Sequence, residues 1–197
     1  MKKFILTVVV ALLSVFGVAA ESNVQLSVKA GVGAAGWIGD DADGANAKFA
    51  YRVGLGVDVP ISGMWGFQTG LNFAGMGAKG DSDLLDLTVN QLYLEVPLMA
   101  TARVDAGNGL GIVFNAGPYL ACGVGGKTKV SGSNAELSSD TFGDEGLRRF
   151  DAGLGFGMNF EFNRFMVGVD TRFGLAKLAS DAKAHNFGVF FGVGYKF

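Results

Sequence analysis

Residues 150–161 read FDAGLGFGMNFE, and this stretch decides the fold class. Its even positions are Phe, Ala, Leu, Phe, Met and Phe, whereas its odd positions are Asp, Gly, Gly, Gly, Asn and Glu. A repeat of two residues is the period of a β-strand, because successive side chains point to opposite faces. The stretch therefore predicts a strand with one apolar, aromatic face and one face of glycine and polar residues.

The same alternation recurs along the chain and predicts eight strands. Besides 149–161, the runs are 24–37, 49–59, 65–73, 92–104, 110–120, 165–175 and 187–197. Each is close to the ~9–11 residues that a tilted membrane strand needs. Short connections at 60–64, 105–109 and 162–164 alternate with long, polar ones at 38–48, 76–90, 124–147 and 176–186. Short turns at one rim and long loops at the other are typical of outer-membrane barrels.

The composition favours lipid as the surroundings of the apolar face. The chain has 197 residues, of which 17% are charged, against about 25% in ordinary soluble domains. A soluble barrel would expose many more Lys and Glu than the 32 glycines and scattered charges found here. Strand edges left open in lipid cost several kcal/mol per unpaired backbone group, so the sheet must close. We therefore predict an all-β, closed, antiparallel, up-and-down transmembrane barrel of eight strands.

The N-terminus predicts export. Two lysines follow Met1, residues 4–18 are apolar, and Ala19 and Ala20 are small. This is the pattern of a secretory signal peptide, and we place its cleavage between Ala20 and Glu21. Residues 1–20 are then the signal peptide and residues 21–197 the barrel domain. An uncleaved membrane anchor is the alternative.

Charged residues on the glycine face are expected to fill the barrel. The positive ones are Lys29, Arg52, Arg103, Arg149, Arg172 and Lys196, and the negative ones are Asp58, Glu95, Asp151, Glu161 and Asp170. The interior of an eight-stranded barrel is wide enough only for its own side chains. We interpret these residues as an interior plug of ion pairs, with Asp151 diagonally adjacent to Arg172. An ion path, which would want one sign of charge, is the alternative.

Other features of the strands carry smaller predictions. Aromatic residues near both ends of the runs suggest two girdles at the lipid headgroups, with Trp37 in the outer one. Pro97 and Pro118 lie inside strands and predict a bulge or kink, because each removes a ladder hydrogen bond. Cys122, the only cysteine, is expected to be a small apolar residue facing lipid near the outer rim.

Three stretches resemble a known family. Residues 91–98, QLYLEVPL, resemble the Y-L-E-I-P-L strand of PorT-like outer-membrane β-barrel domains, and residues 115–120, NAGPYL, resemble the G-P-Y strand that follows it there. The ending FFGVGYKF, residues 190–197, is similar to the closing strand of that family. The resemblance implies an outer-membrane barrel and brings no catalytic residues. Tyr195 and Phe197 also resemble the terminal signal that the barrel assembly machinery reads.

Candidate chemistry is sparse. His185, the only histidine, lies in a long loop near Ser180 and Asp181, which suggests a lipid hydrolase only weakly, because no nucleophile motif is present. Residues 41–44, DADG, resemble a fragment of a calcium loop that lacks its closing Glu. The remaining loop acids are Asp40, Asp81, Asp83, Asp86, Glu136, Asp140, Asp144 and Glu145. We read these residues as solvated loop positions and expect no catalytic, cofactor or metal site.

The prediction for function is an integral protein of the bacterial outer membrane that has a structural or surface-interaction role and is not an enzyme. A loop-borne binding protein for a surface partner, glycan or divalent ion is the alternative, and a lipid-modifying enzyme is a third. The expected partners are outer-membrane lipid and the barrel assembly machinery, with a further surface partner possible through the loops. The net charge of −2 gives no reason to expect nucleic acid. We expect a monomer.

Overall fold

The computed structural model describes residues 24–81, 85–132, 135–143, 146–179 and 182–197. The signal peptide and the Ala20–Glu21 cleavage point lie outside these residues. No helix in the described ranges is long and apolar enough to cross a membrane.

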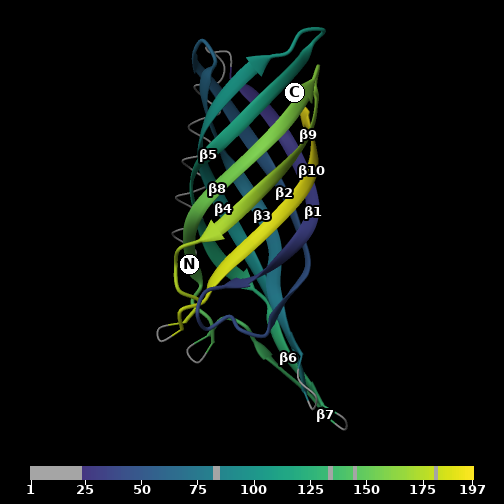
Figure 1. The fold of residues 1–197 in the computed structure, drawn as a ribbon, viewed down its shortest axis with the longest axis vertical. Helices are drawn as coiled ribbons and strands as arrows, with labels where there is room; N and C mark the ends of the chain where they lie inside the picture. The colour runs from purple at the N-terminus through teal and green to yellow at the C-terminus, as the bar shows by residue number, and fades with distance from the viewer. Residues whose placement is uncertain (1–23, 82–84, 133–134, 144–145, 180–181) are drawn as a thin grey trace.

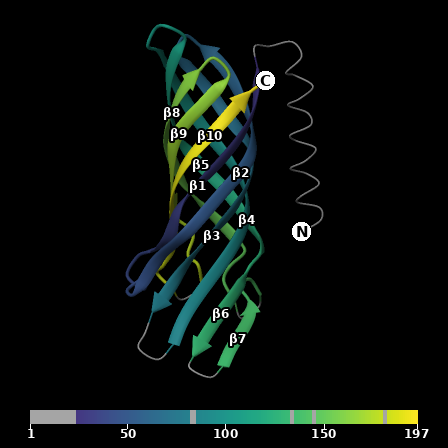
Figure 2. The same ribbon diagram turned by 90° about the vertical axis from the view of Figure 1, so that its right-hand side faces the viewer.

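Eight antiparallel strands close into the predicted barrel (Figures 1 and 2). They are β1 (Gln25–Ile38), β2 (Ala45–Ser62), β3 (Trp65–Asp81), β4 (Leu85–Asp105), β5 (Leu110–Gly125), β8 (Phe150–Phe162), β9 (Phe165–Gly174) and β10 (His185–Lys196). Each strand pairs with its neighbours along the chain. β1 also pairs with β10, from Ser27 opposite Lys196 to Ile38 opposite His185. The sheet therefore has no open edge at lipid depth, as a membrane barrel requires.

The short connections are tight turns whose residues suit left-handed backbone. Gly63 and Asn163 have φ of 56° and 53° in the two-residue turns before β3 and β9. In the turn before β5, the Asp105 carboxylate accepts a hydrogen bond of 2.8 Å from the backbone N–H of Gly107. Asn, Asp and Gly are favoured in such turns for these reasons. These three turns lie at one rim of the barrel, together with the C-terminus of the chain.

Two of the predicted long loops contain more strand than the sequence indicated. β3 continues to Asp81 and β4 begins at Leu85, so most of the expected loop 76–90 is a continued strand pair. The expected loop 124–147 holds a hairpin of β6 (Lys127–Gly132) and β7 (Ala135–Asp140), and β6 pairs with the extended end of β4. At about 3.3 Å per residue, the 21 residues of β4 exceed what a membrane crossing needs. The loop end therefore projects beyond the barrel wall (Figure 2).

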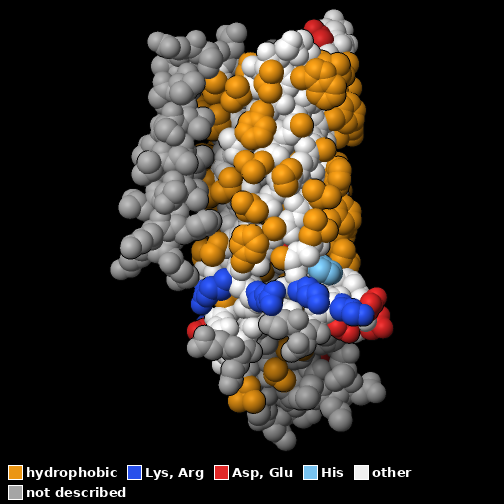
Figure 3. Space-filling view, turned by 90° about the vertical axis from the view of Figure 1, so that its left-hand side faces the viewer, with side chains coloured by type: hydrophobic (Ala, Val, Ile, Leu, Met, Phe, Trp, Pro, Cys, Tyr) orange, Lys and Arg blue, Asp and Glu red, His pale blue; other side chains and the backbone are white. Residues whose placement is uncertain are grey.

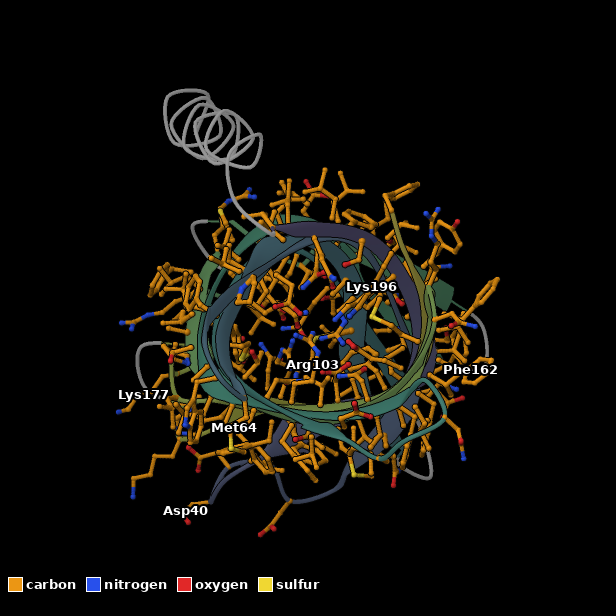
Figure 4. All side chains as sticks on the ribbon, turned by 90° about the horizontal axis from the view of Figure 1, so that it is seen from above. Asp40, Met64, Arg103, Phe162, Lys177 and Lys196 are labelled. Carbon is orange, nitrogen blue, oxygen red and sulfur yellow. The ribbon has the colours of Figure 1, made fainter. Side chains whose placement is uncertain are left out.

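The two faces of the sheet follow the predicted alternation. Apolar side chains such as Leu55, Val167 and Phe191 are 57–66% exposed on the outer surface. Asp58, Glu95 and Arg172 are each 3% exposed inside. Seen from above, Arg103 and Lys196 point into the barrel and Phe162 points away from it (Figure 4). Cys122 is half-buried, and it pairs across the strands with Leu94 and Phe150, at the end of the strands where the loops begin.

The expected bulge at the prolines and the expected lipid-facing position of Trp37 are wrong. The register between β4 and β5 is the same on both sides of the prolines, with Pro97 opposite Tyr119 and Ala100 opposite Ala116. The ladder is interrupted there without a bulge, and the register shift lies instead between Leu92 and Tyr93. Trp37 does not face lipid, because its odd position in β1 points into the barrel mouth, where its indole N–H donates to Gln91 Oε1 at 3.5 Å.

Candidate functional site

The middle of the barrel is crossed by a charged layer, which we call the central layer: Arg52, Asn72, Glu95, Asp170 and Arg172. Glu95 on β4 accepts hydrogen bonds from the guanidinium of Arg172 on β9 at 3.2 Å and from Asn72 on β3 at 2.9 Å. Arg52 on β2 lies 2.8 Å from Asp170 on β9. Strands from opposite walls thus contribute to the same layer. Charged groups taken out of water are tolerated when each has such partners.

A second layer fills the barrel toward the turns. Arg103 on β4 contacts Asp58 on β2 at 2.7 Å and Glu161 on β8 at 3.1 Å. The ammonium of Lys196 on β10 also bonds Glu161, and it reaches Gln25 at 3.1 Å. This layer links β2, β4, β8 and β10. Its two positive and two negative side chains leave no net charge.

The third layer, toward the loops, is held by hydrogen bonds. Asp151 on β8 accepts from Asn186 at 2.9 Å and from the Tyr119 hydroxyl at 3.4 Å. Asn186 also donates to the Tyr93 hydroxyl at 3.1 Å. No salt bridge to Asp151 is seen in the described part of the chain. The expected adjacency of Asp151 and Arg172 is wrong, because the register of β8 and β9 places Arg172 opposite Gly155.

A phenylalanine from the segment after β7 caps this third layer. Phe142 is 3% exposed, and its ring packs edge-on against Tyr93 with centroids 5.4 Å apart. Gly123 makes room for it, because a Cβ at that position would lie 2.6 Å from the ring. Arg149 lies at the rim and not among the ion pairs: its guanidinium lies 5.8 Å from the Phe142 ring centroid and donates to the carbonyls of Phe142 and Gly123.

Sequence reasoning missed the aromatic part of the interior. Tyr93, Tyr119 and Phe190 are each 1–2% exposed and occupy inward positions of β4, β5 and β10. The Arg52 guanidinium lies 4.9 Å from the Phe190 ring centroid, and that of Arg172 lies 5.8 Å from the Tyr119 ring. Strict alternation within each run could have placed these rings inside. Because most aromatic residues of the runs lie on the lipid face, residue type alone did not distinguish these inward rings.

Little empty space remains within the layers. Lys29 donates to Gln68 at 3.1 Å and borders two cavities of about 20 and 30 Å³, each of the order of a water molecule. Larger spaces open at the two ends of the described barrel. A vestibule of about 710 Å³ at the loop end is lined by Trp37, Thr128, Asp140, Leu147 and others, and one of about 420 Å³ lies at the turn end beside Arg103 and Lys196.

The loop candidates occupy ordinary surroundings. His185 Nδ1 lies 3.0 Å from the carbonyl oxygen of Ala176. Asp41 accepts from the backbone N–H of Lys183, and Asp40 pairs with the Lys183 ammonium at 3.4 Å. No group of three His, Cys, Asp or Glu side chains that could hold a metal occurs among the residues described. Ser180, Asp181, Asp83, Asp144 and Glu145 lie outside those residues, as do the side chains of Asp81 and Glu136.

The terminal aromatic pair lies on the outer surface at the turn end. The ring of Tyr195 packs against Phe165 and Phe197 with centroids 5.5 and 5.4 Å apart. Phe197 is 70% exposed, and its backbone N–H donates to Leu26 at 2.9 Å. Both residues are thus available to lipid in the folded barrel.

Comparisons with known proteins give a family and several structural likenesses. The model of the outer membrane protein β-barrel domain family matches residues 18–180. No curated protein sequence matches the chain. Among solved structures, the attachment invasion locus protein Ail of Yersinia pestis shares 17% identity over 88% of this chain and 98% of its own, with a TM-score of 0.45. Neisserial surface protein A shares 11% sequence identity over 87% of this chain and 97% of its own, with a TM-score of 0.49. The outer membrane protein OprG of Pseudomonas aeruginosa shares 13% sequence identity over 88% of this chain and 95% of its own, with a TM-score of 0.42.

Proposed function

This chain belongs to the outer membrane protein β-barrel domain family, and we propose that it serves in the bacterial outer membrane as a closed, non-enzymatic barrel. Its filled interior passes no ions, and its loop end supplies a structural or surface-interaction role. The single observation that carries the proposal is the stack of three polar layers, in which side chains from opposite walls meet. The best-defined link is the pair of Arg172 on β9 and Glu95 on β4.

The charges inside support a filling role over an ion path. Five positive and five negative side chains point inward, and the strongest pairs join opposite signs at 2.7–3.2 Å. A conducting path of one charge sign would leave its charges facing water. Here the cavities between the layers are water-sized, and the Phe142 ring covers the outermost layer.

Current across a planar bilayer tests this proposal. Purified protein inserted at low density is expected to leave the membrane current at its baseline. The variant Phe142→Ala opens only the outer mouth, and it should also be silent because the central layer lies beneath. Large, steady single-channel steps from the unmodified protein would show that the interior is open.

The loop-end vestibule favours a second candidate, in which the loops bind a surface partner such as a glycan. Trp37 lines this vestibule, whereas Trp65, the other tryptophan, is 59% exposed at the turn end. In a Trp65→Phe background, the fluorescence of Trp37 therefore reports on the vestibule alone. A saturable change on titration with a soluble cell-surface oligosaccharide supports this candidate, and a flat response opposes it for that glycan.

We also propose that the chain is related to the PorT-like barrels. The support is the stretch 91–98 in β4, which carries Tyr93 and Glu95 into the interior, and the stretch 115–120 in β5, which carries Tyr119. Glu95 belongs to the central layer, and Tyr93 and Tyr119 belong to the third layer toward the loops. The proposal therefore expects PorT-like relatives to share the same interior contacts.

A further inference from the structure

The basic side chains of the barrel domain are distributed unevenly between its two rims. Five of these side chains point into the interior. At the rim that carries the short turns, Arg164 alone lies in a turn. The other eight lie toward the loop end: Lys48, Lys79, Lys127, Lys129, Arg148, Arg149, Lys177 and Lys183. A row of basic side chains is visible directly beyond the apolar surface (Figure 3).

Three of these residues come together on adjacent segments, and we call them the cationic row: Arg148, Lys177 and Lys183. The backbone N–H of Arg148 donates to Leu178 at 2.8 Å, and that of Leu178 donates to Ala184 at 3.0 Å. The segments that carry the row are therefore hydrogen-bonded side by side. Leu178 and Ala184 are each 5% exposed, whereas their neighbours Lys177 and Lys183 are exposed.

The cationic row borders the apolar surface. Phe150 follows Arg148 by two residues and is 56% exposed, and Leu175 precedes Lys177 by two residues and is 63% exposed. Lys177 points away from the barrel (Figure 4). Arg148 and Lys177 therefore lie directly beyond exposed apolar residues of the barrel surface.

The spacing suits a shared anion. Backbone hydrogen bonds hold these segments side by side, much as they hold strands ~4.8 Å apart, so cations on adjacent segments can contact oxygens of one phosphate group. The ion pair between Lys183 and Asp40 does not replace such an anion. Asp40, which pairs with Lys183 at 3.4 Å, has a side chain 79% exposed, and an exposed ion pair of this kind is weak.

We propose that the cationic row binds the phosphate groups of phosphorylated lipid headgroups in the outer leaflet, while the adjacent apolar columns contact the acyl chains of the same lipids. Long flexible Lys and Arg stems extend from the apolar surface into the headgroup region, as such side chains do at membrane interfaces. The opposite rim, with Arg164 alone, lacks this surface. The protein therefore distinguishes the two leaflets by charge.

Native mass spectrometry of the folded, detergent-solubilised protein tests the proposal. The probes are lipid A with two phosphates, lipid A with one phosphate, and zwitterionic phosphatidylcholine, each added at the same molar ratio. The variants are Lys177→Gln, the triple variant Arg148→Gln, Lys177→Gln and Lys183→Gln, and Arg164→Gln. Arg164→Gln removes one charge at the other rim and is the matched control for Lys177→Gln.

We expect the unmodified protein to retain the two-phosphate lipid best, and the triple variant to bind it at least about tenfold more weakly. Arg164→Gln should bind like the unmodified protein, and phosphatidylcholine should bind equally to all forms. Equal retention of the two-phosphate lipid by the triple variant would overturn the proposal. Complete displacement of the two-phosphate lipid from the unmodified protein by inorganic phosphate at equal phosphate concentration would also overturn it, since the site would then recognise a free anion. Complete displacement by a soluble sulfated polysaccharide at equal sulfate concentration would overturn it too, since the site would then recognise a glycan.

Discussion

Glu95 makes the clearest single contribution to the barrel interior. Its carboxylate is 3% exposed, and it is approached by the guanidinium groups of Arg172 at 3.2 Å and Arg52 at 3.8 Å and by the amide of Asn72. Each of these partners comes from a different strand. The residue therefore connects β4 with β2, β3 and β9 at one point. Its loss would leave Arg172 buried without a carboxylate.

Substitution of Glu95 tests that contribution. Glu95→Gln keeps the volume of the side chain and removes its charge, so the barrel should lose about 3 kcal/mol of unfolding free energy. Urea unfolding in lipid vesicles, followed by heat-dependent gel mobility, measures the change. Asp40→Asn, which removes an exposed carboxylate, is the control and should change stability by less than about 1 kcal/mol. Equal stability of Glu95→Gln and the unmodified protein would contradict this account.

At the scale of the element, β10 shows how one strand separates lipid from interior. Phe190 and Phe191 are adjacent in sequence, yet Phe190 is 1% exposed beside Arg52 and Phe191 is 66% exposed. The backbone alternation alone produces this difference. The interior face of the strand otherwise carries three glycines between Asn186 and Lys196. The Phe190 ring occupies the space beside one of them, Gly188.

Cysteine substitutions at these two neighbours test the orientation of the strand. In a Cys122→Ser background, Phe191→Cys in folded, vesicle-embedded protein should react with a lipid-soluble thiol reagent and not with a water-soluble one. Phe190→Cys should react slowly with both, because the layers around it exclude them. Both sites should react quickly after unfolding in urea, which controls for thiol reactivity. Rapid labelling of folded Phe191→Cys from water would mean that the apolar face does not contact lipid.

At the scale of the whole molecule, assembly and stability make separate demands on the C-terminus. Phe197 is 70% exposed and touches only Tyr195 among the aromatic rings described, so it adds little to the folded barrel. Because Phe197 resembles the signal that the assembly machinery reads, we propose that it acts before folding is complete. The two roles predict different outcomes in cells and in purified form.

The variant Phe197→Ala separates those outcomes. Its level in the outer-membrane fraction of cells should fall at least several-fold, while the protein refolded in detergent should unfold at nearly the same urea concentration as the unmodified form. Phe162→Ala at the same rim, 54% exposed, is the matched control and should assemble normally. A normal cellular level of Phe197→Ala would show that assembly does not depend on this residue.

The barrel could be predicted from the amino-acid sequence, because period-two alternation and alternating loop lengths are local signals that each strand carries in full. The sequence likewise determined which charges face inward along β2, β4, β8 and β9, since the parity of a strand assigns every residue to a face. It could not pair those charges. Glu95 meets Arg172 across 77 positions of sequence, and the register of β8 with β9 rules out the expected neighbour Asp151.

The closure of the barrel mouth and the extension of strands beyond the membrane depend on contacts between segments distant in the chain. Phe142 lies in a polar loop with no periodic pattern, and it is buried because Gly123 and Tyr93, distant in sequence, provide space and an aromatic contact. The continuation of β3 and β4 and the β6–β7 hairpin depend on pairing between segments that lie beyond the predicted strand runs. The cationic row likewise exists only because three loop-end segments hydrogen-bond side by side, and a linear sequence does not encode such a contact at any single position.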